Sequence, residues 1–187
     1  MRHTEKLMTY ESISIAEDTL PNATAPLLQH IVETYAGETN KTASVWRRFT
    51  DADLAWRPHA RSSTVAEVLK HQLLSERRFF AEFLGSAEPA AAEVLPAEQK
   101  VDAFVNRFVD LARARLGWLA QLSQEDWLEQ RSFFDVRRER IWIFWRRVLH
   151  SAHHRTQLTV YLRLLNRDVP RCTVRPPMSR GPVRVRR

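Results

Sequence analysis

The sequence predicts an all-α protein that folds as a four-helix bundle. Only four of the 187 residues are glycine, and long stretches lack proline, which favours helices over a sandwich or barrel of short strands. Apolar residues recur at helical spacing in four separate stretches. At 44% apolar residues the chain can bury one full core. We therefore expect a bundle over residues 24–170, an extended N-terminal arm over 1–23 and a disordered basic tail over 171–187.

The first two helices are expected over residues 26–48 and 64–84. Pro26 suits the first turn of a helix, where its missing N–H costs nothing. Thr64 and the glutamate three residues later fit a capping box at the start of the second helix. Gly85 is expected to end that helix, because glycine readily adopts the left-handed conformation that follows a helix.

The third and fourth helices are expected over residues 96–122 and 141–165. The third carries an apolar face, and the fourth is a long run without proline or glycine. Between them, residues 123–138 form a segment of mixed character. Its large aromatic residues are expected to fold back on the bundle: Trp127, Phe133 and Phe134.

Two histidines of the last helix, His150 and His154, stand four residues apart. That spacing places them on one face, about 40° round and about 6 Å along the axis. Two such imidazoles can share one cation at about 2 Å from each nitrogen. His153 is rotated by about 100° from His154 and should not join them. Because apolar residues flank the pair, it is expected to face the core. Two structural histidines that form hydrogen bonds in the core are the more ordinary interpretation of so short a pattern.

A metal site needs a third ligand, and His71 is the candidate. It belongs to the inward stripe of the second helix, and bundles build metal sites between facing helices. The metalloprotease pattern His-Glu-x-x-His is absent, since Ser151 stands at the position of its glutamate. The chain contains no Glu-x-x-His, which argues against a carboxylate-bridged di-iron site.

The net charge of +7 is concentrated at the end of the chain. Six arginines and no acidic residue follow Asp168, and they account for all but one of these charges. Such a tail would bind phosphate backbones weakly and without sequence preference. We therefore do not expect nucleic acid to be the partner of this protein.

Cysteine content and hydropathy favour a cytoplasmic protein. The single Cys172 excludes an intramolecular disulfide and fits a reducing compartment. The N-terminal residues contain no apolar run like that of a signal peptide. No stretch approaches the roughly 18 apolar residues of a membrane span, so no membrane partner is expected.

Several blocks of sequence occur together in a characteristic order: Trp56-Arg57-Pro58, Ser63 to His71, Glu76 to Phe79, and His150 to Leu158. They resemble the DinB-like (YfiT-like) family of metal-dependent enzymes, which is not the DNA polymerase that shares the gene name. The last block resembles the family signature His-x-x-His-His-Arg-Gly-Gln, with Thr156 in place of glycine. The resemblance extends over residues 26–170.

The resemblance implies a four-helix bundle, often dimeric, with a metal triad at His71, His150 and His154. Some family members are thiol-dependent transferases and isomerases. We accordingly expect a homodimer that binds a divalent zinc or nickel ion and a small-molecule substrate. The ion would activate water or a low-molecular-weight thiol, in a hydrolase or a thiol S-transferase. The alternative is a non-catalytic bundle that a metal stabilises, acting in stress response or as an interaction module.

Two further residues of these blocks have open roles. Glu76 lies five residues after His71, so it is offset on the helix, and a role behind the metal ligands or at the surface is favoured over catalysis. Arg155 would either orient an anionic substrate or form a surface salt bridge.

The tail departs from the family pattern. Many members continue with a Pro-x-Tyr-Gly-Pro-x-Ala-Asp-Glu-like segment, whereas here Pro170 is followed by Arg-Cys-Thr-Val-Arg. Codons that these residues permit spell a family-like ending in a displaced frame. We therefore hypothesise that the tail results from a frameshift in the gene or its sequencing. Resequencing that finds codons unable to encode the family ending would eliminate this hypothesis.

Overall fold

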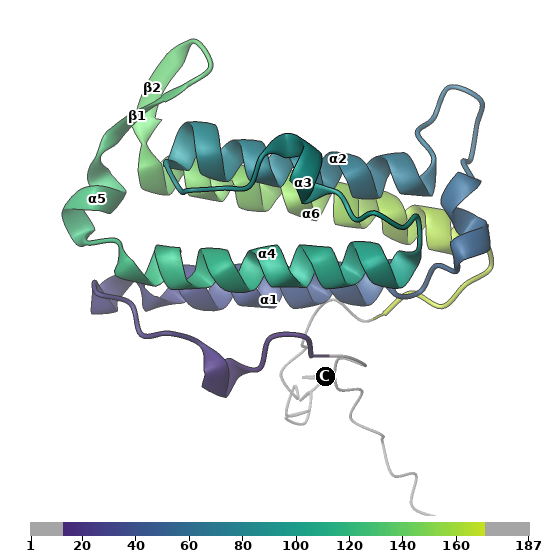
Figure 1. Ribbon diagram of the computed structural model, residues 1–187, viewed down its shortest axis with the longest axis horizontal. Helices are drawn as coiled ribbons and strands as arrows, with labels where there is room; N and C mark the ends of the chain where they lie inside the picture. Colours follow the sequence, from purple (N-terminus) through teal and green to yellow (C-terminus); the bar gives the residue numbers. More distant parts are fainter. Residues whose placement is uncertain (1–12, 171–187) are drawn as a thin grey trace, which may run out of the picture.

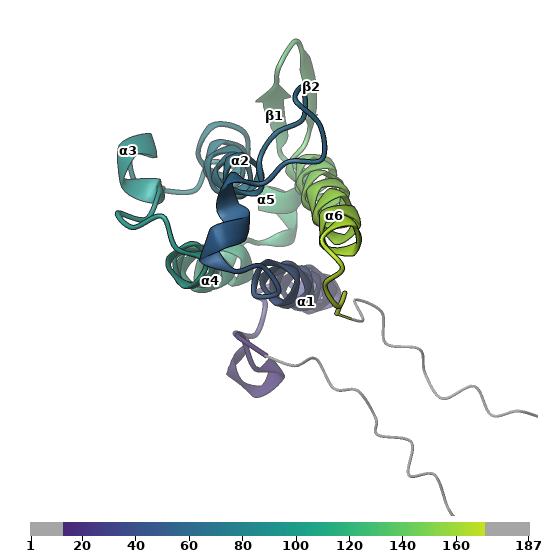
Figure 2. The same cartoon turned by 90° about the vertical axis from the view of Figure 1, so that its right-hand side faces the viewer.

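The computed structural model describes residues 13–170, and four long helices form its body. They are α1 (Gln29–Trp46), α2 (Val65–Arg78), α4 (Val101–Gln121) and α6 (Arg140–Leu164). Seen from the end, the helices occupy the four corners of a bundle, with α2 beside α6 and α4 beside α1 (Figure 2). The all-α prediction is therefore confirmed. The predicted basic tail lies outside the described residues.

The four long helices do not simply alternate in direction along the chain. Helices α1 and α6 run in one direction and α2 and α4 in the other (Figure 1). The parallel neighbours α2 and α4 require a long crossover, which contains the short helix α3 (Ala91–Val94). Pro26–Leu28 forms a 3₁₀ turn before α1, and Asp51–Ala55 forms another, η3, between α1 and α2. A third 3₁₀ turn, Glu17–Thr19, lies in the N-terminal segment.

Local signals set both ends of the second helix. The Thr64 hydroxyl accepts a hydrogen bond from the Glu67 N–H at 3.2 Å, and the Glu67 carboxylate accepts one from the Thr64 N–H at 2.7 Å. After Arg78 the helix continues as a π-helical turn, η4 (Phe79–Leu84). It ends at Gly85, whose φ of 90° lies in the left-handed region that favours glycine. The predicted capping box and the predicted stop are both confirmed.

The third long helix begins later than predicted. Residues 96–100 are not helical, and α4 starts at Val101. The N–H of Val101 donates to the Asp51 side chain at 2.8 Å, across a separation of 50 residues. A tertiary contact therefore supplies the acceptor that a free helix N-terminus needs.

The segment between α4 and α6 forms a short helix and a hairpin, which were not predicted. Helix α5 spans Gln124–Leu128, and strands β1 (Gln130–Phe133) and β2 (Val136–Glu139) pair antiparallel. Trp127 is buried and packs on Phe144, as expected. Phe134 does not fold into the core, because it occupies the two-residue hairpin turn with a φ of 53° and is 63% exposed.

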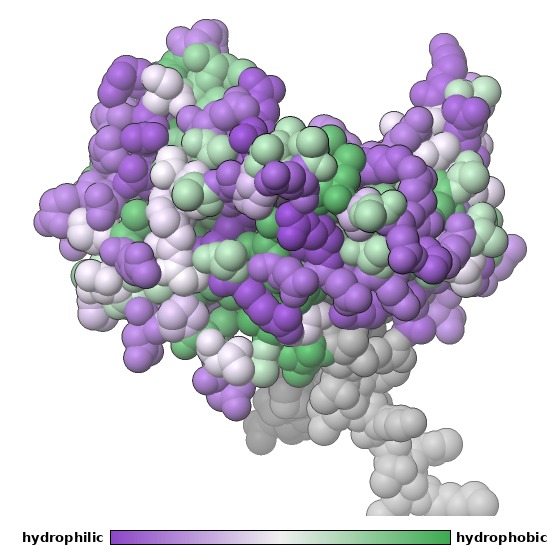
Figure 3. All heavy atoms as spheres, in the orientation of Figure 1, coloured by the Kyte–Doolittle hydropathy of each residue, from purple (hydrophilic) through white to green (hydrophobic). Residues whose placement is uncertain are grey.

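Two projections rise on the side of the bundle where α2 and α6 lie. One is the hairpin, and the other is the loop between η3 and α2 (Figure 1). Side chains leave a saddle between the two projections (Figure 3). Within residues 13–170, no helix combines the length and the apolar character that crossing a membrane requires.

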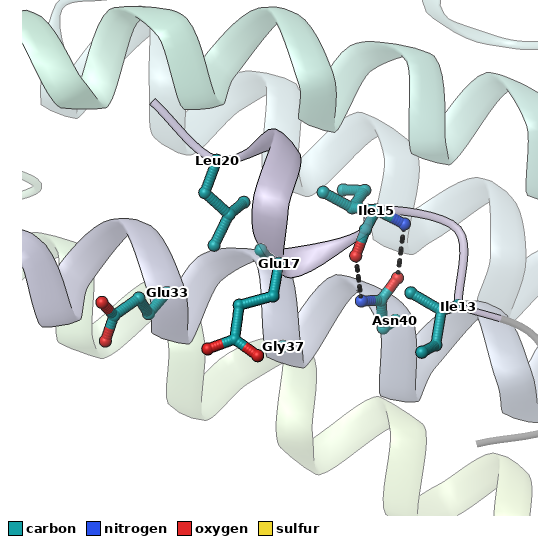
Figure 4. Close-up of a pocket in the computed structure, with 8 residues that line it drawn as sticks. Ile13, Ile15, Glu17, Leu20, Glu33, Gly37 and Asn40 are labelled. Carbon is teal, nitrogen blue, oxygen red and sulfur yellow. Dashed lines mark hydrogen bonds between the residues drawn. The ribbon is translucent and has the colours of Figure 1, made fainter. Parts of the chain in front are cut away.

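The described part of the N-terminal segment packs along α1. The amide of Asn40 accepts from the Ile15 N–H and donates to the Ile15 carbonyl (Figure 4). It also accepts from the Ser14 N–H. Ile15 is buried, and a cavity of about 230 Å³ lies between this segment and α1. Further along, the Thr24 N–H donates to the Ala120 carbonyl of α4 at 2.7 Å.

The centre of the bundle contains an ionic network with one side chain from each long helix. The Glu76 carboxylate accepts from the Tyr35 hydroxyl at 2.8 Å, pairs with Arg147 and lies 3.4 Å from Arg115. Arg115 also binds both carboxylate oxygens of Glu88. Burial, reinforced by the charge of Glu76, raises the pKa of Tyr35 and keeps its hydroxyl protonated. Glu76 thus lies in the core, and the surface role considered for it is wrong.

Candidate metal centre

Helices α2 and α6 bring three imidazoles together, although His71 precedes His150 by 79 residues in the sequence. The Nε2 atoms of His71 and His150 are 3.3 Å apart, and those of His154 and His150 are 3.2 Å apart. The potential ligand atoms of all three residues lie within 4.8 Å of one another. The structure therefore places the three predicted residues in one cluster.

The two distances from His150 Nε2 to its neighbours fit a shared cation better than they fit hydrogen bonds. Four nitrogens at about 2.0–2.1 Å from a tetrahedral ion are about 3.3 Å apart. A neutral imidazole Nε2 carries either one hydrogen or one lone pair. His150 Nε2 can therefore complete only one of its two close contacts as a normal hydrogen bond. A cation would accept the lone pairs of all three nitrogens, so the donor set suits a divalent metal ion.

Gln157 fixes the orientation of one of these rings. Tyr161 donates its only hydroxyl hydrogen to the Ser63 carbonyl at 3.1 Å, so it accepts the hydrogen bond from the Gln157 amide nitrogen. The amide oxygen of Gln157 then faces His154 Nδ1 at 3.0 Å. Because an amide oxygen only accepts, His154 carries its hydrogen on Nδ1 and directs the Nε2 lone pair at the cluster.

This chain of contacts was not predicted from the sequence. The available signal was Gln157 itself, which belongs to the signature block and follows His154 by one helical turn. Ser63, whose carbonyl accepts the hydrogen bond from Tyr161, belongs to another of the blocks that carry the family resemblance. The two blocks are thus joined in space through Tyr161.

The surroundings of the cluster keep His150 and His154 neutral. Burial lowers the pKa of His150 to about 4, and the neighbouring His154, His71 and Arg147 act in the same direction. Burial also lowers the pKa of His154, and the hydrogen bond to Gln157 opposes this shift only in part. Both residues are therefore neutral near pH 7, which is the state that binds a metal ion.

The cluster does not face the core, contrary to prediction. His71 is exposed, and His150 and His154 are half-buried. The buried side of α6 carries Arg147 and Ser151 instead, because Arg147 must reach the carboxylate at the centre of the bundle. The helix is therefore rotated so that the histidines lie at its solvent edge, where a small molecule can approach.

His153 and Arg155, which are close to the cluster in the sequence, do not belong to it in the structure. His153 is exposed and contributes no atom to the three-nitrogen cluster. Arg155 pairs with Glu38 of α1, and Lys41 binds the same carboxylate at 2.7 Å. Of the two roles considered for Arg155, the structure contains the salt bridge.

Fold and site together define a class of protein: a four-helix bundle with three histidines converging between two of its helices. The sequence model of the DinB family matches residues 21–179, and the chain belongs to this family. No match was found among functionally curated proteins.

Two solved structures share the fold. A DinB-like protein from Bacillus cereus ATCC 10987 superposes with a TM-score of 0.67 at 18% identity, covering 79% of this chain and 97% of that one. A DinB-like protein from Bacillus subtilis superposes with a TM-score of 0.62 at 18% identity, covering 79% of this chain and 99% of that one. At this identity the likeness establishes the bundle architecture.

Proposed function

We propose that the chain is a metal-dependent enzyme in which His71, His150 and His154 hold one divalent cation, zinc or nickel. The observation that carries the proposal is the convergence of three Nε2 atoms from two helices. Imidazole ligands suit both metals. When bound, the ion would supply a Lewis acid that lowers the pKa of water or a thiol towards about 7, as hydrolases and thiol S-transferases require.

The residues of the chain prepare the site for this chemistry. Burial keeps His150 and His154 neutral, so metal binding needs no prior loss of protons near pH 7. Gln157 directs the His154 lone pair. Within residues 13–170, no fourth histidine, cysteine or carboxylate joins the cluster. Three protein ligands would leave one coordination position for water or substrate.

The substrate is proposed to be a small molecule that approaches past the exposed His71. The only cysteine, Cys172, follows the bundle, so a reacting thiol would come from a cosubstrate. A homodimeric assembly and a cytoplasmic location remain part of the proposal, on the family resemblance and on the sequence composition.

The alternative function is a metal-stabilised bundle without catalysis, acting in stress response or as an interaction module. The observation that favours it is the position of the ligands, because an ion held by α2 and α6 would cross-link two helices of the core. The two functions differ in whether a coordination position is open.

Metal content tests the ligand set. Protein purified without an affinity tag should contain about one zinc or nickel ion per chain. His71→Ala, His150→Ala and His154→Ala should each lose most of it. The matched control is His153→Ala, an adjacent and exposed histidine outside the cluster, which should retain the metal. Full occupancy in His71→Ala would overturn the proposed triad.

Spectroscopy separates the two functions. In cobalt-substituted protein, a small thiol such as 2-mercaptoethanol should change the visible absorption spectrum if a position is open to exogenous ligands. An unchanged spectrum at saturating thiol would favour the closed, structural site.

A further inference from the structure

A continuous series of aromatic rings leads away from the three-histidine cluster. The ring of Phe79 lies 5.8 Å from that of His150 and 5.8 Å from that of Phe133. Phe133 lies 5.5 Å from Trp142 and 4.8 Å from Phe134. We call Phe79, Phe133, Phe134 and Trp142 the aromatic shelf.

The outer part of the aromatic shelf is open to solvent. Phe134 is 63% exposed and Trp142 is 38% exposed. Figure 3 shows apolar surface on the projecting hairpin, with hydrophilic residues around it. Exposed aromatic residues that adjoin one another are typical of binding sites, whereas isolated exposed apolar residues are not.

Arginines lie against the outer rings of the shelf. The guanidinium carbons of Arg138 and Arg146 are 5.7 and 5.8 Å from the centre of the Trp142 ring. Both arginines are exposed, and in the described part of the chain neither forms an ion pair with a carboxylate. Arg78 lies 5.3 Å from the Phe134 ring but is already paired with Glu82. Arg138 and Arg146 therefore offer planar donors that no acid of the described chain occupies.

We propose that the aromatic shelf binds the substrate and that the substrate is a small apolar acid. Its acidic group would meet Arg138 and Arg146, and its apolar body would lie along Trp142 and Phe133. The remaining end would reach the histidine cluster past Phe79. This inference rests on the proposed function, because the cluster gives the shelf its reactive end.

Charge and shape distinguish this occupant from others. A cationic ligand would be repelled by these two guanidiniums, and a neutral one would leave them without an anionic partner, since among the described residues Arg138 otherwise donates only to the Arg137 carbonyl at 2.7 Å. A small molecule is favoured over a protein segment because the rings lead to the histidine cluster, where one end of the ligand has a function.

A fluorescent acid provides the test. 8-Anilinonaphthalene-1-sulfonate carries two aromatic groups and one sulfonate, and its fluorescence should rise saturably with the full-length, metal-free protein. The double variant Arg138→Gln/Arg146→Gln should weaken its affinity at least about fivefold, since two charge-assisted contacts are lost. The matched control is Arg163→Gln, an exposed arginine of the same helix with no ion pair in the described part, which should bind like the wild type.

Competition and a neutral probe separate the acid from the apolar body. Octanoate should displace the sulfonate probe, and octylamine should not. Binding of the neutral N-phenyl-1-naphthylamine should weaken in Trp142→Ala and stay unchanged in the double arginine variant. The proposal would be overturned if Arg163→Gln weakened the affinity for the sulfonate probe as much as the double variant does. It would also be overturned if octylamine displaced the probe as effectively as octanoate. An unchanged affinity in the double variant would do the same, and thermal midpoints verify that each variant is folded.

Zinc titration distinguishes failure of this inference from failure of the proposed function. Zinc affinity should be unchanged in the double arginine variant, which leaves the three histidines intact. If zinc does not bind the wild type while the probe results hold, the metal function fails and the acid-binding surface remains. If zinc binds and the arginines have no effect on the probe, the shelf fails and the metal function remains.

Discussion

The contact between Gln157 and His154 gives a sharp test of how the cluster is oriented. Gln157→Leu removes the acceptor at 3.0 Å from His154 Nδ1 while keeping a side chain of similar size. His154 is then free to carry its hydrogen on Nε2, which would remove the lone pair from the cluster. We therefore expect a loss in zinc affinity and only a small change in the stability of the metal-free protein.

The size of the effect follows from the role of the contact. Removing a hydrogen-bond partner of a metal-binding histidine weakens metal affinity about 10- to 100-fold, or about 1.4–2.7 kcal/mol. At one free zinc concentration, well above both dissociation constants, the metal-induced stabilisation falls by the same free energy. For a chain of this length, the metal-induced rise in thermal midpoint should shrink by about 3–10 °C.

Two variants control this experiment. Gln157→Glu keeps an acceptor at the same place and should retain zinc affinity. Gln121→Leu makes the same chemical change at an exposed position at the end of α4, away from the cluster, and should behave as the wild type. A zinc affinity in Gln157→Leu within about twofold of the wild type would refute the reasoning, because the smallest expected effect is about tenfold.

Three further predictions concern stability. Glu76→Gln should lower the free energy of unfolding by about 3–5 kcal/mol, because it leaves the buried Arg147 without its carboxylate, whereas Arg115 keeps Glu88. A change below about 1 kcal/mol in urea unfolding would contradict this. Burial alone would raise the pKa of Glu38, but the hydrogen bonds from Lys41 and Arg155 outweigh burial and hold this pKa below its ordinary 4.5. The stability that Glu38 contributes is therefore present above pH 4.5 and is lost as the pH falls through the lowered pKa. Glu38→Gln should flatten this acid loss in thermal scans, and an unchanged pH profile would count against the reasoning. Deleting residues 172–187 should leave the thermal midpoint nearly unchanged, because this arginine-rich segment follows Pro170, and a loss of several degrees would show that it packs on the bundle.

The sequence by itself determined the features that depend on neighbours along the chain. Helical periodicity identified the four long helices, because each must bury one apolar face. Thr64 and Gly85 marked the ends of α2, since capping and the left-handed stop are local conformational effects. The spacing of His150 and His154 placed both rings on one side of α6, as helix geometry requires.

Only the tertiary structure decided how those helices are rotated and which of their side chains come into contact. The apolar stripe of α6 predicted that the histidines face the core. In the structure, Arg147 takes the inward position because Glu76 lies buried opposite it. A buried ion pair of this kind joins positions 71 residues apart, and no local pattern specifies it. The start of α4 likewise depends on Asp51, because the acceptor for its first N–H comes from another turn of the fold.

The position of the aromatic shelf also depends on tertiary structure. The hairpin is short and arginine-rich, and its turn, Phe134-Asp135, lacks the glycine or asparagine that usually signals one. From the sequence, Phe133 and Phe134 were expected to fold back on the bundle, whereas pairing of β1 with β2 carries Phe134 out to solvent beside Arg78. The sequence determined which side chains are available for chemistry, and the packing of α2, α6 and the hairpin decided which of them meet. The reason is that long-range contacts fix helix rotation and strand position only when the whole core is assembled.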